Sequence, residues 1–138
     1  MMTRLFIDTN VIMDLMECRT PFVHDALRII RLGQDGVHQL FVSDLTFANV
    51  AYLSRKSMSL TQLYGQLSKL RNYLHVASIG EQAVDAALRL HSKDFEDALQ
   101  YFAAKQIAAD CILTRNKKDF TFSDIQVWTP EEFLAVAR

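Results

Sequence analysis

Five short runs of apolar and β-branched residues alternate with longer segments of helical periodicity, and this alternation constrains the fold more than any other feature. The runs are residues 5–7, 40–42, 75–79, 111–114 and 125–128. Apolar strands joined by helices favour a parallel sheet, whose two faces are covered by the crossover helices. We therefore expect an α/β fold, a three-layer α/β/α sandwich with a central parallel sheet of about four to five strands. The two prolines and four glycines form no linker, so residues 1–138 are expected to make a single domain.

The helical segments carry recognisable end signals, such as proline in a first turn and glycine after a last turn. Helices are expected from Thr20-Pro21 to Gly33, from Ser43 or Asp44 to Arg55-Lys56, from Leu60 to Leu74, from Ala83 to Leu90, from Ala98 to Ala109, and onward from Thr129-Pro130. A further short helix is expected to begin near Val11.

Composition and charge exclude several classes of protein. Hydrophobic residues make up 50% of the chain and charged residues 22%, as in folded globular proteins. The net charge of −1 argues against a protein that coats nucleic acid through bulk electrostatics. Neither cysteine has a Cys or His partner at zinc spacing, and no apolar run reaches the roughly 18 residues of a membrane span. We expect a cytoplasmic protein without a membrane segment.

Polar residues gather directly after the expected strands, where the ligand crevice of a parallel α/β sheet lies. Asp8 follows the first run, Ser43 and Asp44 follow the second, and residues 114–120 follow the fourth. The segment 94–97, with three acidic residues, opens the alanine-rich helix. This placement predicts an acidic site at one edge of the sheet.

Asp8 is the most informative of these residues, because a carboxylate behind a buried strand is costly unless it is paired or bound to a cation. The alternative is a helix N-cap, a part that Asn10 could also play. Asp94 and Asp97 stand three residues apart, as an N-cap and its N3 position do, and acids at a helix start are common for electrostatic reasons alone.

The three acids together are harder to explain by helix starts. If Asp8 and Asp97 approach to about 4 Å, their repulsion is on the order of 4 kcal/mol at an effective dielectric constant of 20. Either one carboxyl group holds a proton, or a divalent cation lies between the two. An all-oxygen ligand set favours Mg²⁺ or Mn²⁺ over zinc. Such a cation can orient a phosphodiester and activate water, as metal nucleases do.

Other residues beside this edge are candidates for substrate contacts. Arg115, Lys117 and Lys118 could hold flanking phosphates of RNA, and Thr9, Ser43 and Thr114 supply hydroxyl groups. Each of these side chains is equally compatible with a turn, a cap or a solvated helix end.

Four motifs follow one another across nearly the whole chain. They are residues 5–11 with Asp14, residues 42–43 with the helix that ends at Arg55-Lys56, residues 94–98, and residues 112–120. With the closing residues 128–133, this order resembles the PIN-domain family, in particular the small VapC-type ribonuclease toxins of bacterial toxin–antitoxin pairs.

The resemblance implies a PIN-like fold with an acidic pocket that binds Mg²⁺ or Mn²⁺ and cuts single-stranded or looped RNA. By position, Asp8 and Asp97 would be the principal ligands, with Asp94 or Glu96 in support. The fourth acidic position would fall to Asn116 or Asp119. Supporting residues would be Thr9, Asn10, Ser43, Asn49 and Thr114. A homodimer and a small antitoxin protein that blocks the pocket are implied as well.

The chain departs from the family pattern at one position. Family members usually carry Glu on the helix after the second strand, where this chain has Asn49. An amide oxygen can coordinate a cation but carries no charge, so either the metal affinity is lower or the role of the Glu passes to Asp44, Asp94 or Glu96.

Three functions therefore compete. The first is a metal-dependent ribonuclease toxin, and the second is a catalytically weakened PIN-fold module that binds RNA or protein. The third, a phosphoryl-accepting signalling domain, lacks its acceptor, because residues 79–81 offer no Asp after the middle strand.

Overall fold

A computed structural model describes residues 3–137 of the chain. Residues 1, 2 and 138 of the expected domain lie outside this range. Within it, the strands are β1 (Thr3–Ile7), β2 (His38–Ser43), β3 (His75–Ala77), β4 (Cys111–Leu113) and β5 (Gln126–Trp128). The helices are α1 (Thr9–Met16), α2 (Phe22–Gln34), α3 (Asp44–Ser54), α4 (Leu60–Tyr73), α5 (Gly80–Leu90), α6 (Phe95–Gln106) and α7 (Pro130–Val136), and a 3-10 helix, η1 (Lys117–Phe120), precedes β5.

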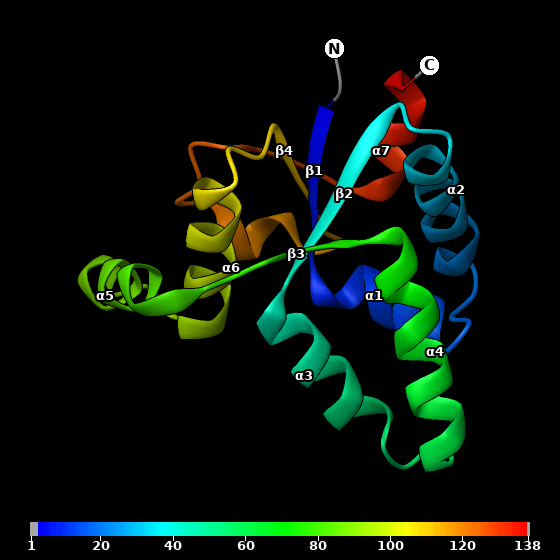
Figure 1. The fold of residues 1–138 in the computed structure, drawn as a ribbon. Helices are drawn as coiled ribbons and strands as arrows, with labels where there is room; N and C mark the ends of the chain where they lie inside the picture. The colour runs from blue at the N-terminus through cyan, green and yellow to red at the C-terminus, as the bar shows by residue number, and fades with distance from the viewer. Residues whose placement is uncertain (1–2, 138) are drawn as a thin grey trace.

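The strands form one parallel sheet in the order β3-β2-β1-β4-β5, with β1 at its centre (Figure 1). This confirms the expected α/β fold with a parallel central sheet. Ile7 of β1 pairs with Leu113 of β4, so the next residues, Asp8 and Thr114, leave the sheet side by side. The register therefore brings two of the predicted site residues to the same edge.

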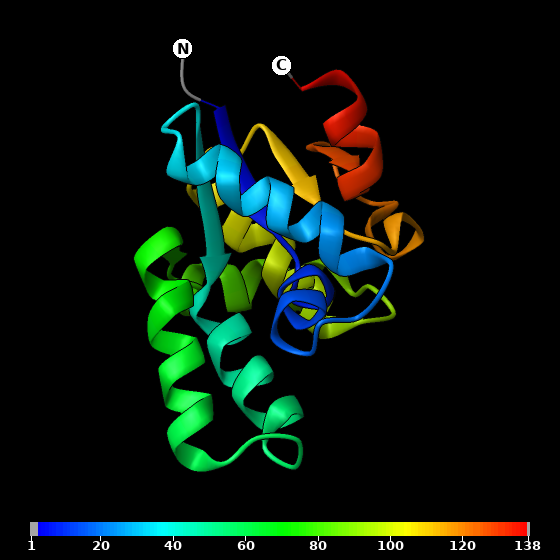
Figure 2. The ribbon, with the colours of Figure 1, turned by 90° about the vertical axis from the view of Figure 1, so that its right-hand side faces the viewer.

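The two faces of the sheet carry separate apolar cores, which makes the three layers of the sandwich. Leu5 and Ile7 face a core that includes side chains from α1, α2, α4 and α7. Phe6 points to the opposite face, where it joins Tyr101 and other side chains of α6. Figure 2 shows α2 and α7 along one side of the sheet and the α3–α4 pair extending away from it. Because successive side chains of β1 point to opposite faces of the sheet, they contact different helices, and these helices form the two outer layers.

Several boundaries differ from those expected, each for a local reason. The first helix starts at Thr9, not near Val11, because Asp8 takes the N-cap position. Strand β3 ends at Ala77 and α5 already begins at Gly80, whose φ of +76° is readily adopted only by glycine. Helix α6 ends at Gln106, before Ala108 with its φ of +53°.

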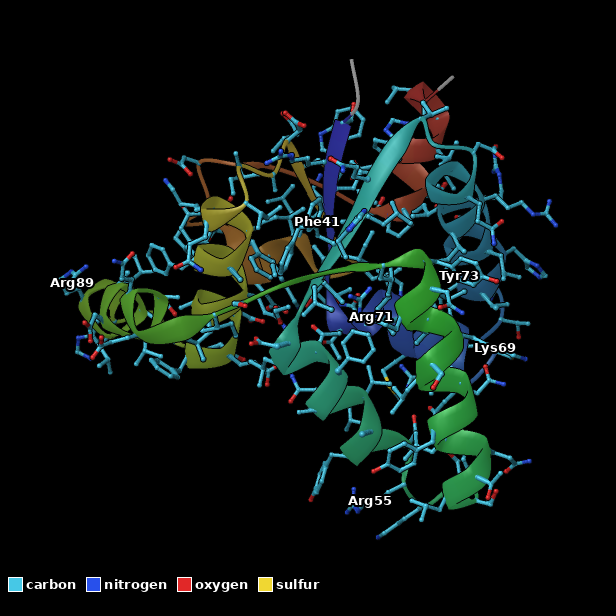
Figure 3. The ribbon with its side chains drawn as sticks, in the orientation of Figure 1. Phe41, Arg55, Lys69, Arg71, Tyr73 and Arg89 are labelled. Atoms are coloured by element: carbon cyan, nitrogen blue, oxygen red, sulfur yellow. The ribbon has the colours of Figure 1, made fainter. Side chains whose placement is uncertain are left out.

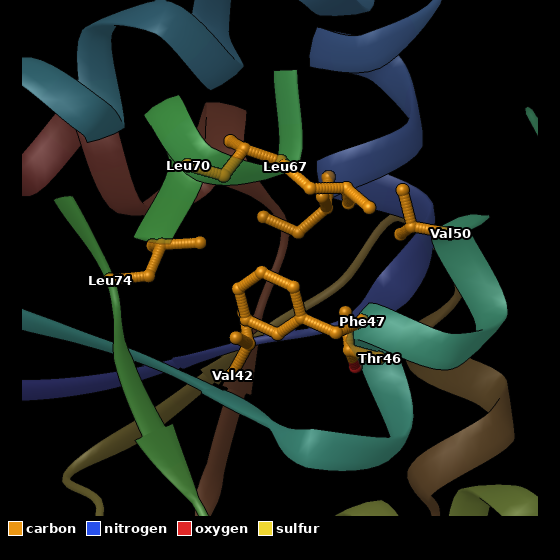
Figure 4. A pocket seen from close by; sticks show the side chains of 8 residues that line it. Val42, Thr46, Phe47, Val50, Leu67, Leu70 and Leu74 are labelled. Atoms are coloured by element: carbon orange, nitrogen blue, oxygen red, sulfur yellow. The ribbon is translucent and has the colours of Figure 1, made fainter. Parts of the chain in front are cut away.

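Helices α3 and α4 enclose a small apolar void against the sheet (Figure 4). Its volume is about 10 Å³, and Val42, Phe47 and Leu70 are among the side chains around it. This space is no larger than a single water molecule requires, so the void is a packing gap and not a ligand site. Among residues 3–137, no helix combines the length and apolarity needed to cross a bilayer.

Candidate active site

The carboxylate of Asp8 lies at the centre of the site, held by two hydrogen bonds. One oxygen accepts from the backbone N–H of Thr9 at 2.8 Å, and the other accepts from the Thr114 hydroxyl at 2.8 Å. The side chain is buried, with 8% of its residue surface exposed. Burial raises the pKa of Asp8, the bonds from Thr114 and Thr9 oppose this, and the charges of Asp119 and Asp94 add to it. Asp8 is thus both the helix cap and a member of a charged cluster.

The pKa of Asp97 is also raised by these surroundings. Its N–H donates to the side chain of Asp94, the N-cap of α6, at 3.1 Å, so the expected cap and N3 arrangement is confirmed. Burial first, and then the charges of Asp94, Asp8, Asp119 and Glu96, raise the pKa of Asp97 to about 7. Five carboxyl groups from three segments of the chain therefore lie within electrostatic range of one another.

Glu96 belongs to this cluster and links it to α3. Burial, followed by the charges of Asp94 and Asp8, raises the pKa of Glu96, while a hydrogen bond from Asn49 lowers it. The Asn49 amide donates to a Glu96 carboxylate oxygen at 2.8 Å. Where the family pattern has Glu, this chain therefore has Asn49, whose side-chain amide on α3 binds the Glu96 carboxylate of α6. Asp44 instead accepts from the N–H groups of Leu45 and Ile79.

A buried polar network lies beneath the carboxylates and joins the elements that carry them. Gln100, fully buried on α6 one turn after Asp97, accepts from the Ser43 hydroxyl at 2.7 Å. Its amide donates to the Thr46 hydroxyl at 3.0 Å, and the hydroxyl groups of Thr46 and Thr9 are hydrogen-bonded to each other at 3.1 Å. Such a satisfied network fixes α1, α3 and α6 relative to one another.

Sequence reasoning missed Gln100, although a polar residue on the buried face of an alanine-rich helix was an available signal. It did select Ser43 and Thr9, which the structure places in the same network. Asn10 and Asn116 lie outside this network: the Asn10 side-chain amide and the Asn116 backbone N–H donate to the Thr114 hydroxyl, at 3.2 and 3.1 Å. Thr114 therefore has its single proton directed at Asp8.

The three basic residues proposed for RNA contacts have different surroundings in the structure. Arg115 forms a forked ion pair with buried Asp14, at 2.7 and 3.1 Å, and its guanidinium lies 4.0 Å from the centre of the Phe22 ring. Lys117 pairs with Glu132 at 3.1 Å.

Among the described residues Lys118 has no ion-pair partner. Of the other basic residues, Arg55 lies just after α3, and Lys69 and Arg71 lie on α4 (Figure 3).

The chemistry of the clustered donors decides which metal ion they suit. Within residues 3–137, no three acidic, His or Cys side chains are already arranged around a common metal position. The clustered donors are nevertheless all oxygen atoms, and their mutual repulsion is what a hard cation relieves. The residues present therefore fit Mg²⁺ or Mn²⁺ better than a softer metal.

The raised pKa of Asp97 predicts how stability depends on pH in metal-free buffer. Between the ordinary pKa of 3.8 and the folded-state value of about 7, the folded protein binds more protons at Asp97 than the unfolded chain. This contribution to stability is present at low pH and is lost as the pH rises through that window. Thermal unfolding of Asp97→Asn should therefore show a smaller loss in Tm from about pH 5 to about pH 8 than the wild type. Equal losses in the two proteins would contradict the assignment.

Comparison with known proteins identifies the fold and the family. Residues 4–118 match the model of the PIN domain. The chain is 30% identical over 135 residues to Ribonuclease VapC1 of Aquifex aeolicus, an alignment that covers 94% of this chain and 92% of that protein.

Solved structures agree on the architecture. VapBC-1 from nontypeable Haemophilus influenzae matches with a TM-score of 0.72 at 20% identity, over 94% of this chain and 99% of that one. A toxin–antitoxin complex from Klebsiella pneumoniae matches with a TM-score of 0.64 at 22% identity, over 91% and 97%. The resemblance drawn from the sequence motifs is confirmed: the chain belongs to the PIN-domain family and is a homologue of the VapC ribonucleases.

Proposed function

We propose that this chain is a divalent-cation-dependent endoribonuclease that hydrolyses phosphodiester bonds of RNA, and that it is the toxin of a toxin–antitoxin pair. The observation that carries the proposal is the cluster of five carboxyl groups at the carboxyl edge of the sheet, in a chain 30% identical to a VapC ribonuclease. Like charges gathered around the buried carboxylate of Asp8 cost stability, and a function that uses them accounts for their presence.

In this proposal Asp8, Asp97 and Asp119 hold Mg²⁺ or Mn²⁺, and Asp94 and Glu96 support them. Asp119 is preferred to Asn116 because its charge acts on both Asp8 and Asp97. When bound, such a cation lowers the pKa of a water molecule and offsets charge on the phosphate.

The chain's own residues orient the reacting groups. Thr114 and the Thr9 N–H fix the direction of the Asp8 carboxylate, and Gln100 holds α6 against α1 and α3. The pKa of Asp97 is about 7 without a cation, so below that pH a proton competes with the cation for this carboxylate. Hydrolysis in this site would use water as the nucleophile and would need no nucleophilic side chain from the protein.

The proposed partners are an RNA substrate, a small antitoxin protein and a second copy of the chain. Support for an antitoxin comes from the Klebsiella pneumoniae neighbour, which is a toxin–antitoxin complex. The homodimer is an expectation from the family resemblance.

Asn49 favours one alternative function, a PIN-fold module that binds RNA or protein with little catalysis. Its neutral amide replaces the usual carboxylate, although it brings Glu96 to the same place. Wild-type protein that binds RNA but does not cleave it, together with an active Asn49→Glu variant, would support this alternative.

Thermal unfolding with and without divalent cations tests the proposal. Mg²⁺ or Mn²⁺ at about 100 times its dissociation constant should stabilise the fold by roughly 2.7 kcal/mol, because only the folded chain brings the carboxylates together. The double variant Asp8→Asn, Asp97→Asn should lose the shift, whereas Asp44→Asn should keep it. A wild type without a divalent-specific shift, or a double variant that retains one, would show that the site is wrongly assigned.

A further inference from the structure

A cleft adjoins the carboxylate cluster on the side of the α5–α6 loop. It has a volume of about 440 Å³ and lies between that loop and η1. Its lining includes Asp94, Asp97 and Asp119 of the carboxylate cluster, together with Lys93, Lys118 and Phe122. The volume is within the range of small-ligand sites in proteins. The cleft therefore shares three acidic residues with the proposed catalytic centre and adds two cations and an aromatic ring.

Both walls of the cleft are held by internal contacts. The Phe122 ring meets the Tyr101 ring edge to face, with centroids 5.1 Å apart, and Tyr101 donates to the nearby Asp124 carboxylate at 2.6 Å. On the opposite wall the Ser92 hydroxyl donates to the Asp94 carbonyl oxygen at 2.8 Å. Phe122 lines the cleft and is half-buried against the core on the α6 side, so a ligand meets a ring that is already held in place, which reduces the entropy lost on binding.

The charges in the cleft are distributed in a way that suits a polyanion chain. Lys93 and Lys118 are exposed, and neither has an ion-pair partner within residues 3–137. Lys93 directly precedes Asp94, and Lys118 directly precedes Asp119. The unpaired ammonium groups can therefore hold a phosphate immediately beside the reacting one.

We propose that this cleft is a nucleotide subsite that holds one unpaired nucleotide of the RNA next to the scissile phosphate. Lys93 and Lys118 contact its phosphate, and its base stacks on Phe122. A base within a duplex is stacked on its neighbours and cannot also lie on Phe122, so the subsite selects single-stranded or looped RNA. This inference rests on the proposed function and specifies its substrate.

The contribution of the lysines is tested by the salt dependence of RNA binding. We would measure the anisotropy of a short fluorescein-labelled single-stranded RNA in metal-free buffer, with the Asp8→Asn variant as the parent to prevent cleavage. Each phosphate contact on a single strand contributes about 0.7 to the slope of log K against log salt concentration. Because the two lysines share one phosphate, adding Lys93→Gln and Lys118→Gln together should lower the slope by about 0.7. The matched changes Lys56→Gln and Lys69→Gln, which remove the same charge outside the cleft, should leave it unchanged.

The contribution of Phe122 is tested by an abasic site moved along the same RNA. In the Asp8→Asn parent, one abasic position should weaken binding by roughly 5- to 150-fold, the range expected from 1–3 kcal/mol per stacked base. Adding Phe122→Leu, which keeps an apolar side chain against Tyr101, should remove this sensitivity. The exposed-aromatic control Tyr64→Leu should retain it, and near-ultraviolet circular dichroism would verify that both variants are folded.

The outcomes separate this inference from the proposed function. An unchanged salt slope in the double lysine variant, no RNA binding by the parent, or equal abasic sensitivity with and without Phe122 would overturn the subsite. RNA cleavage by the wild type that depends on Asp8 would then still support the ribonuclease. Absence of cleavage with either cation would count against the ribonuclease itself.

Discussion

Replacement of Asp8 by Asn is expected to reduce RNA cleavage by more than about 100-fold while the fold stays intact. Loss of an outer hydrogen-bond partner of a metal ligand typically costs 10- to 100-fold, and Asp8 is proposed as a ligand itself. Its carboxylate is also the one to which Thr114 directs its proton, so the substitution changes both the charge and the orientation of the central group.

The same substitution should not lower stability in metal-free buffer at neutral pH. An amide retains one oxygen acceptor, so one of the two hydrogen bonds to Asp8 is lost, at a cost of about 0.5–1.5 kcal/mol. Against this, the raised pKa of Asp8 means that its buried charge is disfavoured in the folded state, and the amide removes that charge. Stability sacrificed for activity in this way is typical of active sites.

Cleavage of a labelled single-stranded RNA, followed on a gel with Mg²⁺ or Mn²⁺, measures the first effect, and thermal unfolding measures the second. Asp44→Asn is the matched control, because Asp44 lies at the same edge of the sheet but its carboxylate accepts from the N–H groups of Leu45 and Ile79. It should retain full activity. Equal cleavage by wild type and Asp8→Asn would point to a contaminating nuclease or to another site.

The fold was predictable because its strongest signals are local in the sequence. Buried runs such as residues 5–7 alternate with amphipathic helices, and caps such as the Thr129–Glu132 box mark helix starts directly. Boundaries were less predictable, because the Asp8 carboxylate that caps α1 is also held by Thr114, which follows a strand distant in the sequence. That contact spans 106 residues and depends on the register of β1 and β4.

The candidate site was predictable to the extent that its residues are acidic and follow strands. Asp8 was selected because it follows a strand, and Asp97 because it stands among three acids at the start of the alanine-rich helix; the structure places the two within electrostatic range of each other. Gln100 was not selected, because a single glutamine gains meaning only once Ser43 and Thr46 are known to lie opposite it. Neither could the sequence reveal that Arg115 is paired with Asp14, a residue 101 positions away.

Arg115→Met is expected to lower the free energy of unfolding by about 3–5 kcal/mol, the cost of removing one partner from a buried ion pair. Asp14 is 1% exposed, and both its oxygens are held by the Arg115 guanidinium. Arg19 reaches Asp14 only at 3.9 Å, so it cannot replace the fork. The variant would leave a buried carboxylate without adequate compensation, and urea unfolding at neutral pH would measure the loss.

Two further variants separate a buried pair from a phosphate-binding cation. Asp14→Leu combined with Arg115→Met should recover most of the lost stability, because apolar side chains can replace a buried pair when both partners are removed. Lys117→Met, which breaks a pair with Glu132 in which both side chains are about half exposed, should cost no more than about 1 kcal/mol. If Arg115→Met instead unfolds like the wild type and loses RNA binding, the guanidinium serves the substrate. Destabilisation that the double variant relieves would mean that Arg115 anchors the loop carrying Thr114, and through it the direction of the Asp8 carboxylate.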